Sequence, residues 1–352
     1  MRIYISKLCR NDTKIVIGHG ALNLLEEIEG ETVLLHSKKI DPTNILRKLN
    51  NVTSVIAIED GEKVKNFEKI LEILRLIHNS ASPDLEWIIA AGGGTLLDVA
   101  GFLASIYKRG IKLINIPTTF LGMVDAAMGG KNGINLDSVK NVLGTFYQPC
   151  LVISDTSFLA TLPSEELSNG LAEVIKYGIT LDKMLCDLLE NKHDLILSLE
   201  EETIKEIIYR SALNKMKIVE IDEWDNKGIR IVLNYGHTIG HAIEAATNFN
   251  VPHGKAIAVG MVYEAALAER MGMIGEDEVE YLARLLKLYR LPTSIKDLGV
   301  NIDMDIAVKA LRRDKKRKRG VIMMPLLTGI GSWRAVEMDI GTLEMHLKSC
   351  LK

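Results

Sequence analysis

Three histidines and one glutamate are the residues of this sequence best suited to holding a metal ion. His237 and His241 lie four positions apart, His253 follows closely, and each of the three is next to a glycine. A helix would place positions i and i+4 on one face, so spacing alone favours His237 and His241 as an imidazole pair. Spacing does not settle which two of the three histidines would bind. With Glu173 as the carboxylate, two imidazoles form a catalytic zinc set with an open coordination position.

Glu173 lies one helical turn before Lys176. The plain alternative for this spacing is an ion pair on the surface of a helix. The neighbours Leu171, Val174 and Ile175 are apolar, and charged side chains are rarely buried unless they are paired or coordinated. This context favours a functional position for Glu173.

A second candidate site is a glycine loop. The segment Ile88–Thr95 runs from an apolar strand through Gly92, Gly93 and Gly94 into a helix whose first turn carries Asp98. Such a loop lets the backbone approach a phosphate at the positive end of a helix. The spacing is not the usual dinucleotide fingerprint, and a simple tight turn is the alternative. Asp60–Glu62, at the end of an earlier strand, provides a second candidate nucleotide contact.

The block of residues 107–148 closes a helix, passes through a strand and continues as a long polar, glycine-rich connection without clear periodicity, which predicts a functional loop. Lys131 and Lys140, among glycines, suit an anionic substrate. A solvated basic turn is the alternative, and the spacing of a Walker A loop is absent.

The basic run around Lys315 and Lys316 has three interpretations. A nucleic-acid patch or a localisation signal is one, and a solvated face near a helix end is the usual one. In the third, one of these lysines holds the anionic groups of a substrate.

The predicted secondary structure that must position these residues changes near residue 160. Before it, candidate strands alternate with helical stretches (strands at 32–37, 54–59, 86–91, 112–116 and 151–155; helices at 64–77 and 95–108). This predicts an α/β doubly wound, Rossmann-like domain over residues 1–160, with residues 1–5 and 13–17 as an antiparallel edge pair. After it, helical spacing dominates (182–190, 195–218, 236–247, 254–271, 277–286 and 304–316). We expect an all-α domain over residues 161–352.

Composition excludes several classes of function. The 352 residues are 47% hydrophobic and 25% charged with a net charge of −3 and 5% aromatics, which argues against nucleic-acid binding. No apolar run is long enough to span a membrane. The N-terminus lacks the pattern of a secretory signal, and the four cysteines form no CxxC pair. These features predict a cytoplasmic protein with reduced thiols.

Together, the motifs resemble the 3-dehydroquinate synthase family of sugar-phosphate cyclases over most of the chain. The matching segments are DGEKVK (60–65), GGGTLLDVAGF (92–102), YKRG (107–110), PTTFLGMVDAAMGGKNGIN (117–135), KNVLGTFYQP (140–149), LPSEELSNGLAEVIKYG (162–178), LNYGHTIGHAIE (233–244), HGKAIAVGMV (253–262) and DKK (314–316). The sequence departs from the family pattern at Ala126-Ala127, Asn132 and Lys255, none of which is a ligand.

The resemblance implies an NAD-binding N-terminal domain, a helical metal- and substrate-binding domain and a homodimer. It implies that Glu173, His237 and His253 bind a divalent metal, zinc or cobalt, while His241 contacts the substrate. The implied substrate residues are Arg109, Asp125, Lys131, Asn141, Lys176, Lys215, Arg230, Asn234, His241 and Lys315 or Lys316, with Arg109 reaching across the dimer. The implied NAD contacts are Asp60, Glu62, Lys65, Gly92, Gly93, Gly94, Asp98, Thr118, Thr119, Lys131 and Lys140.

The activity implied is conversion of 3-deoxy-D-arabino-heptulosonate 7-phosphate to 3-dehydroquinate and phosphate, in the shikimate pathway. It combines transient oxidation at C5, phosphate elimination, re-reduction and intramolecular aldol closure, without net redox change. The alternatives are a related cyclase acting on sedoheptulose 7-phosphate or glucose 6-phosphate, and a polyol or glycerol-phosphate dehydrogenase. A non-enzymatic binding module would leave the charged residues and the metal set without a role.

Overall fold

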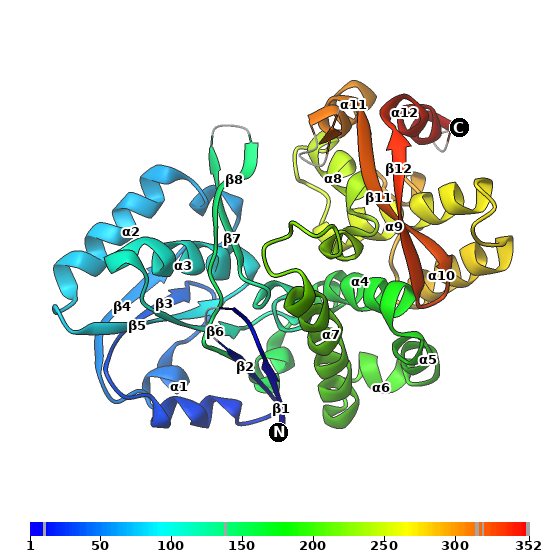
Figure 1. Ribbon diagram of the computed structural model, residues 1–352. Helices are drawn as coiled ribbons and strands as arrows, with labels where there is room; N and C mark the ends of the chain where they lie inside the picture. The colour runs from blue at the N-terminus through cyan, green and yellow to red at the C-terminus, as the bar shows by residue number, and fades with distance from the viewer. Residues whose placement is uncertain (10–11, 137–138, 314–316, 319, 350–352) are drawn as a thin grey trace. The chain divides into compact units, whose positions relative to one another are not determined.

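The computed structural model describes residues 1–9, 12–136, 139–313, 317–318 and 320–349. Its contacts divide the chain into two compact units (Figure 1). The first unit contains Met1–Leu162 and Leu199–Trp224, and the second contains Pro163–Ser198 and Asp225–Lys352. The main boundary lies close to the expected residue 160, but Leu199–Trp224 belongs to the first unit, which a single boundary did not anticipate.

A seven-stranded sheet forms the centre of the first unit. Its order is β1 (Arg2–Ser6), β2 (Thr13–Ile17), β9 (Leu151–Ser154), β6 (Lys112–Pro117), β5 (Leu85–Gly92), β3 (Glu31–Ser37) and β4 (Val52–Ile58). All neighbours are parallel except β1 and β2, which form the expected antiparallel edge pair. The doubly wound class is therefore confirmed.

Helices cover both faces of this sheet. Ile45 of α1 (Thr43–Leu46) and Leu25 of the short helix Ala21–Glu27 pack in one buried cluster with alternate strand residues such as Ile89. Figure 1 shows α2 (Phe67–Ser80) and α3 (Gly94–Ile106) on the opposite side of the strands. The central strands β3, β5, β6 and β9 are thus buried on both faces, as a parallel sheet requires.

The polar block of residues 107–148 is more ordered than the expected irregular loop. Lys131–Leu136 (β7) and Val139–Phe146 (β8) pair as an antiparallel hairpin. Gly133 lies opposite Gly144 in this ladder, so the pair contributes no apolar side chains. This explains why apolar alternation does not reveal these strands.

Helix α7 (Glu201–Ile221) joins the first unit through contacts at its C-terminal end. Glu220 accepts hydrogen bonds from the Tyr4 hydroxyl at 2.8 Å and from the Lys7 backbone N–H at 3.2 Å. Glu223 accepts one from the Cys9 N–H at 2.9 Å. These bonds attach α7 to the β1–β2 edge.

The second unit is helical, as expected. Its helices are α4 (Ser164–Leu181), α5 (Lys183–Asn191), α6 (His193–Leu197), α8 (His237–Ala246), α9 (His253–Arg270), α10 (Glu276–Leu288), α11 (Met304–Arg313) and α12 (Ile340–Ser349). It also contains an unanticipated antiparallel sheet of β10 (Arg317–Lys318), β11 (Val321–Gly329) and β12 (Ser332–Asp339).

Helices α8 and α9 approach each other closely through glycines. A Cβ on Gly260 would lie 2.0 Å from the Gly236 carbonyl oxygen, and one on Gly240 would lie 2.6 Å from Ile257 Cδ1. Gly236 also has a φ of +78°, in the left-handed region that favours glycine. Small residues at these positions let the two helices that carry His237 and His253 pack tightly.

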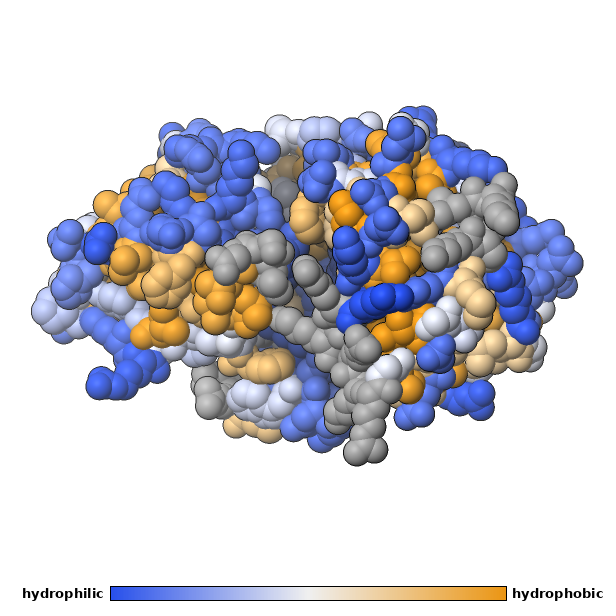
Figure 2. Space-filling view, turned by 90° about the horizontal axis from the view of Figure 1, so that it is seen from above, coloured by the Kyte–Doolittle hydropathy of each residue, from blue (hydrophilic) through white to orange (hydrophobic). Residues whose placement is uncertain are grey.

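Among the described residues, no helix has the length and apolar character needed to cross a membrane. Figure 2 shows hydrophilic residues spread over the face seen from above, with apolar residues in separate groups.

Candidate functional site

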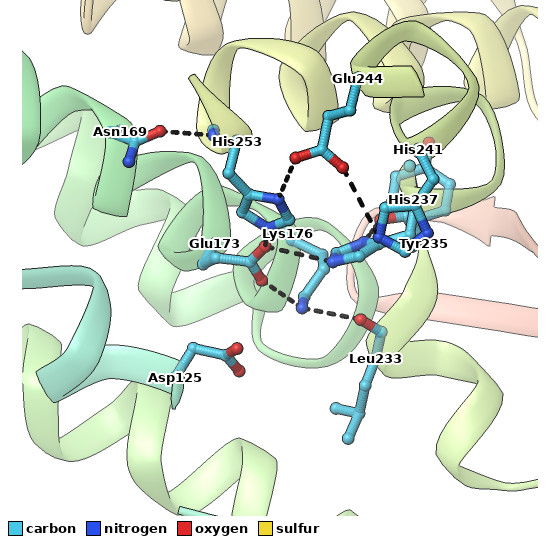
Figure 3. A network of polar contacts seen from close by, with 12 residues as sticks. Asp125, Asn169, Glu173, Lys176, Leu233, Tyr235, His237, His241, Glu244 and His253 are labelled. Carbon is cyan, nitrogen blue, oxygen red and sulfur yellow. Dashed lines mark hydrogen bonds and ion pairs between the residues drawn. The ribbon is translucent and has the colours of Figure 1, made fainter. Parts of the chain in front are cut away.

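Glu173, His237 and His253 meet in the second unit. Glu173 projects from α4, His237 is the first residue of α8, and His253 is the first residue of α9 (Figure 3). The Nε2 atoms of His237 and His253 lie 3.4 Å and 3.3 Å from the same oxygen, Glu173 Oε1. One ligand atom from each residue falls within 4.8 Å of the others, a spacing that suits a bound metal ion.

The other ring nitrogen of each imidazole is occupied by a hydrogen-bond acceptor. His237 Nδ1 lies 3.1 Å from the Tyr235 carbonyl oxygen, and His253 Nδ1 lies 3.2 Å from Glu244 Oε1. An Nδ1–H that donates to such an acceptor leaves the Nε2 lone pair available. Both rings therefore present Nε2 toward Glu173, so the donor set fits a divalent metal such as zinc or cobalt.

Charges around Glu173 keep its carboxylate ionised. Burial alone would raise its pKa, but the ion pair with Lys176 and the nearby His237 hold the pKa well below its usual range. Lys176 Nζ also donates to the Leu233 carbonyl oxygen at 2.8 Å. Lys176 is thus fixed between the candidate ligand and the chain that leads to His237.

The two candidate histidine ligands differ in their electrostatics. Burial depresses the pKa of His237 well below its usual value. Burial also opposes protonation of His253, but its hydrogen bonds to Glu173 and Glu244 outweigh this and raise its pKa to about 10.

His241 lies beside this group without joining it. Its side chain is 56% exposed, and its ring centroid is 5.2 Å from that of His237 and 6.4 Å from that of His253. Spacing alone had favoured His241 as the partner of His237, whereas the geometry brings His253 to Glu173. This placement is compatible with a substrate contact for His241.

The remaining expected substrate residues of the second unit are Arg230 and Asn234. They begin and end the short helix Arg230–Asn234, which precedes α8, and the Arg230 side chain is buried. Lys315 and Lys316 lie outside the described residues.

In the first unit, the expected NAD contacts gather where parallel strands end. Strand β5 ends at Gly92 and β6 at Pro117, and the Thr118 N–H donates to the Gly92 carbonyl oxygen at 3.0 Å. Helix α3 begins directly after Gly93, and Thr119 lies within 3.5 Å of a Cβ built on Gly93. The free N–H groups at this helix start form a suitable anion site.

Lys65 connects the segment after β4 to α3. Its Nζ lies 2.6 Å from Asp98 Oδ2, and the lysine side chain is only 4% exposed. Burial raises the pKa of Asp98 despite this partner. The buried Lys65 and the partly exposed Asp98 are therefore paired at the edge that carries the glycine loop.

The hairpin β7–β8 reaches the same edge. Asn135 Nδ2 donates to Glu62 Oε1 at 3.0 Å, and Lys140 Nζ lies 4.0 Å from the same oxygen. Asp60 accepts a hydrogen bond from Ser37 at 2.7 Å. Glu62 and Lys140, far apart in sequence, are thus brought together.

Asp125 and Lys215 form a further pair in the first unit. Asp125 lies in a single turn of π-helix, Gly122–Ala126, a feature frequent at functional sites. Lys215 Nζ, on α7, donates to the Asp125 carbonyl oxygen and contacts its carboxylate, both at 2.8 Å. Through Lys215, α7 provides the charged partner of Asp125 in the first unit.

Lys131, Asn141 and Arg109 are exposed. Lys131 begins β7, and Asn141 has a φ of +50° within β8. Arg109 has a φ of +66° and follows Lys108 at +49°, an uncommon succession for non-glycine residues. Such backbone strain is typical of functional positions.

Three residues of these networks were missed from the sequence. Glu244 contacts His253, Asn135 contacts Glu62, and Asn169 Oδ1 accepts a hydrogen bond from the Gly254 N–H at the start of α9. Glu244 could have been found, because positions 237, 241 and 244 share one face of a helix. The other two depend on contacts between distant segments.

Solved structures of similar fold contain both cofactors that this geometry suggests. A 2-deoxy-scyllo-inosose synthase complexed with carbaglucose-6-phosphate, NAD+ and Co2+ has a TM-score of 0.87 and 26% identity, covering 99% of this chain and 100% of its own. A 2-epi-5-epi-valiolone synthase from Streptomyces hygroscopicus with NAD+ and Zn2+ has a TM-score of 0.86 and 26% identity, covering 100% and 99%. The fold is that of the sugar-phosphate cyclases.

Sequence comparison narrows this class. Residues 55–169 match the model of the 3-dehydroquinate synthase N-terminal domain, and residues 170–317 match that of the C-terminal domain. A 3-dehydroquinate synthase from Sulfurisphaera tokodaii is 51% identical, with 100% of both chains covered. The chain belongs to the 3-dehydroquinate synthase family.

Proposed function

We propose that this protein catalyses the 3-dehydroquinate synthase reaction, converting 3-deoxy-D-arabino-heptulosonate 7-phosphate to 3-dehydroquinate and inorganic phosphate. The observation that carries the proposal is the convergence of two imidazole Nε2 atoms on one oxygen of Glu173. The full-length relatives named for this reaction support the choice of substrate.

The two bound groups would supply the redox and Lewis-acid chemistry: NAD a reversible oxidation at C5, and the metal polarisation of the C4 and C5 hydroxyls. Glu173, His237 and His253 would hold the metal. The residues after β4, β5 and β6 would hold NAD, with Lys65 and Asp98 beside the glycine loop.

Other side chains would bind and orient the substrate. Lys176 and Arg230 in the second unit, and Lys131 and Lys215 in the first, offer cations for the carboxylate and phosphate groups. Asp125, Asn141 and Asn234 offer acceptors or donors for hydroxyl groups. His241, exposed beside the metal ligands, can move a proton at a substrate oxygen.

The proposal also includes a homodimer in which Arg109 contacts the substrate of the partner subunit. The exposed, left-handed position of Arg109 supports such a reach. Light scattering measures the dimer, and Arg109→Ala should then lower turnover. A cytoplasmic location stays a prediction from the sequence.

The test is an assay of the purified protein, loaded with zinc or cobalt and NAD, on three phosphosugars. With the heptulosonate phosphate we expect release of one equivalent of phosphate without net absorbance change at 340 nm. Preference for sedoheptulose 7-phosphate or glucose 6-phosphate would replace the proposal with another cyclase. Steady NADH accumulation would replace it with a dehydrogenase.

A further inference from the structure

Glu244 lies between a candidate metal ligand and the histidine that does not join the metal group. Its Oε1 is 3.2 Å from His253 Nδ1, and its Oε2 is 3.9 Å from His241 Nε2 (Figure 3). Its side chain is 11% exposed. A carboxylate in this position contacts both imidazoles at once.

The two metal-facing imidazoles are held by different acceptors. His237 Nδ1 faces a neutral carbonyl oxygen of its own loop, that of Tyr235. His253 Nδ1 faces a carboxylate from another helix, because Glu244 is on α8 whereas His253 begins α9. A charged acceptor fixes the tautomer more strongly and makes Nε2 a better donor to a metal.

Backbone contacts around His253 do not determine the orientation of its ring, so this orientation depends on Glu244. Asn169 on α4 accepts the Gly254 N–H and a Cβ on Gly254 would lie 2.1 Å from the Asn169 carbonyl oxygen, so the start of α9 is fixed. These contacts place the Cα of His253 but not its ring. The hydrogen-bonding contacts of the ring are those with Glu173 and Glu244.

We propose that Glu244 is the positioning residue that selects His253 over His241 as the second imidazole ligand. One carboxylate oxygen turns His253 Nε2 toward Glu173, and the other holds His241 on the opposite side, available to the substrate. This inference rests on the proposed metal site, and it assigns the choice of ligand to a residue that binds neither metal nor substrate.

The experiment measures the dissociation constant of Zn2+ by competition with a chromophoric chelator. The variants are Glu244→Gln, Glu244→Ala, His253→Ala and the double variant His253→Ala with Glu244→Ala. Glu165→Gln is the matched control, since Glu165 is an exposed residue of α4 paired with Lys255 outside this network. Thermal unfolding of each metal-free protein accompanies the measurement.

We expect Glu244→Ala to weaken zinc binding by about 10- to 100-fold. Glu244→Gln should lose less, because its amide oxygen still accepts from Nδ1–H. The double variant should bind zinc no more weakly than His253→Ala alone, because Glu244 acts through His253. The visible spectrum of the Co2+ form should change in Glu244→Ala and remain unchanged in Glu165→Gln.

An affinity of Glu244→Ala within about threefold of the parent protein would overturn the inference, as would additive losses in the double variant. Failure of the parent protein to bind zinc, or full binding by His253→Ala, would instead refute the metal site. If Glu244→Ala does not fold, the comparison of Glu244→Gln with Glu165→Gln decides, and equal affinities count against Glu244.

Discussion

His253 Nε2 lies 3.3 Å from Glu173 Oε1, although 80 positions separate the two residues in the chain. Glu173 on α4 is fully buried, whereas His253, the first residue of α9, is half-buried. Glu173 is therefore a fixed anion, whereas the position of the His253 ring depends on contacts with other helices.

Glu173→Gln should abolish tight metal binding and, with it, turnover. The substitution keeps the size of the side chain but removes the charge that Lys176 and the imidazoles face. We expect zinc affinity to fall by more than about 100-fold, beyond the loss typical of an outer contact. A chelator should likewise stop turnover of the parent enzyme, and added zinc should restore it. Full activity of a metal-free preparation would contradict this prediction.

His241→Ala should lose turnover while retaining metal. Its ring is 56% exposed and lies outside the group of candidate ligands. We expect kcat to fall by about 100-fold or more, as for loss of a general acid or base, with zinc content equal to that of the parent protein. The zinc content and kcat of the variant are both measured and compared with those of the parent protein. Loss of metal here would reinstate the pair that spacing alone favoured.

Lys65→Met should weaken NAD binding and destabilise the first unit. It leaves Asp98, whose side chain is 26% exposed, without its partner, at a cost of about 1–3 kcal/mol. Adding Asp98→Asn should recover part of this loss, because both members of the pair are then removed. Urea unfolding and NAD titration measure the two effects. Lys63→Met, at an exposed neighbouring position, is the control and should change neither.

His346 should make the stability of the protein fall as the pH is lowered below the ordinary histidine pKa of about 6.5. Burial lowers its pKa, its Nδ1 accepts from Arg270 at 2.8 Å, and its Nε2 donates to the Tyr263 carbonyl oxygen at 2.8 Å. Because the folded pKa is below the unfolded value, the unfolded chain binds a proton first as the pH falls. The stability associated with neutral His346 is therefore present above pH about 6.5 and declines below it.

His346→Gln tests this dependence. At pH 8 the variant should be less stable by about 1–2 kcal/mol, because buried hydrogen bonds are lost. The difference from the parent protein should shrink as the pH falls toward 5.5. A constant difference across this range would show that His346 does not titrate between the two states.

Local patterns predicted most of the fold. The strands of the parallel sheet are apolar runs, and the helices of the second unit have clear spacing, so neither depends on distant partners for recognition. The hairpin β7–β8 was not predicted, because its pairing of Gly133 with Gly144 lacks apolar alternation. Strands β11 and β12 were also missed, and Pro325 within β11 weakens its β pattern.

The candidate metal site also depends on contacts between distant segments, which local sequence patterns do not predict. The spacing of His237 and His241 is local and visible in the sequence, yet the geometry groups His237 with His253. That grouping depends on the close approach of α8 and α9, which Gly236 and Gly260 permit. Composition and spacing do not report how closely two helices pack, so the resemblance to a family supplied what the residues alone did not.

The assignment of Leu199–Trp224 to the first unit has a consequence for synthesis of the chain. When Leu162 leaves the ribosome, α7 and its Lys215 have not yet been made, so Asp125 lacks its partner and the β1–β2 edge lacks the anchor at Glu220. The segment Pro163–Ser198 must emerge before that helix does. The first unit is therefore synthesised as two separate segments of the chain. A gene cut after codon 162 would encode an incomplete core rather than an independently folding NAD domain.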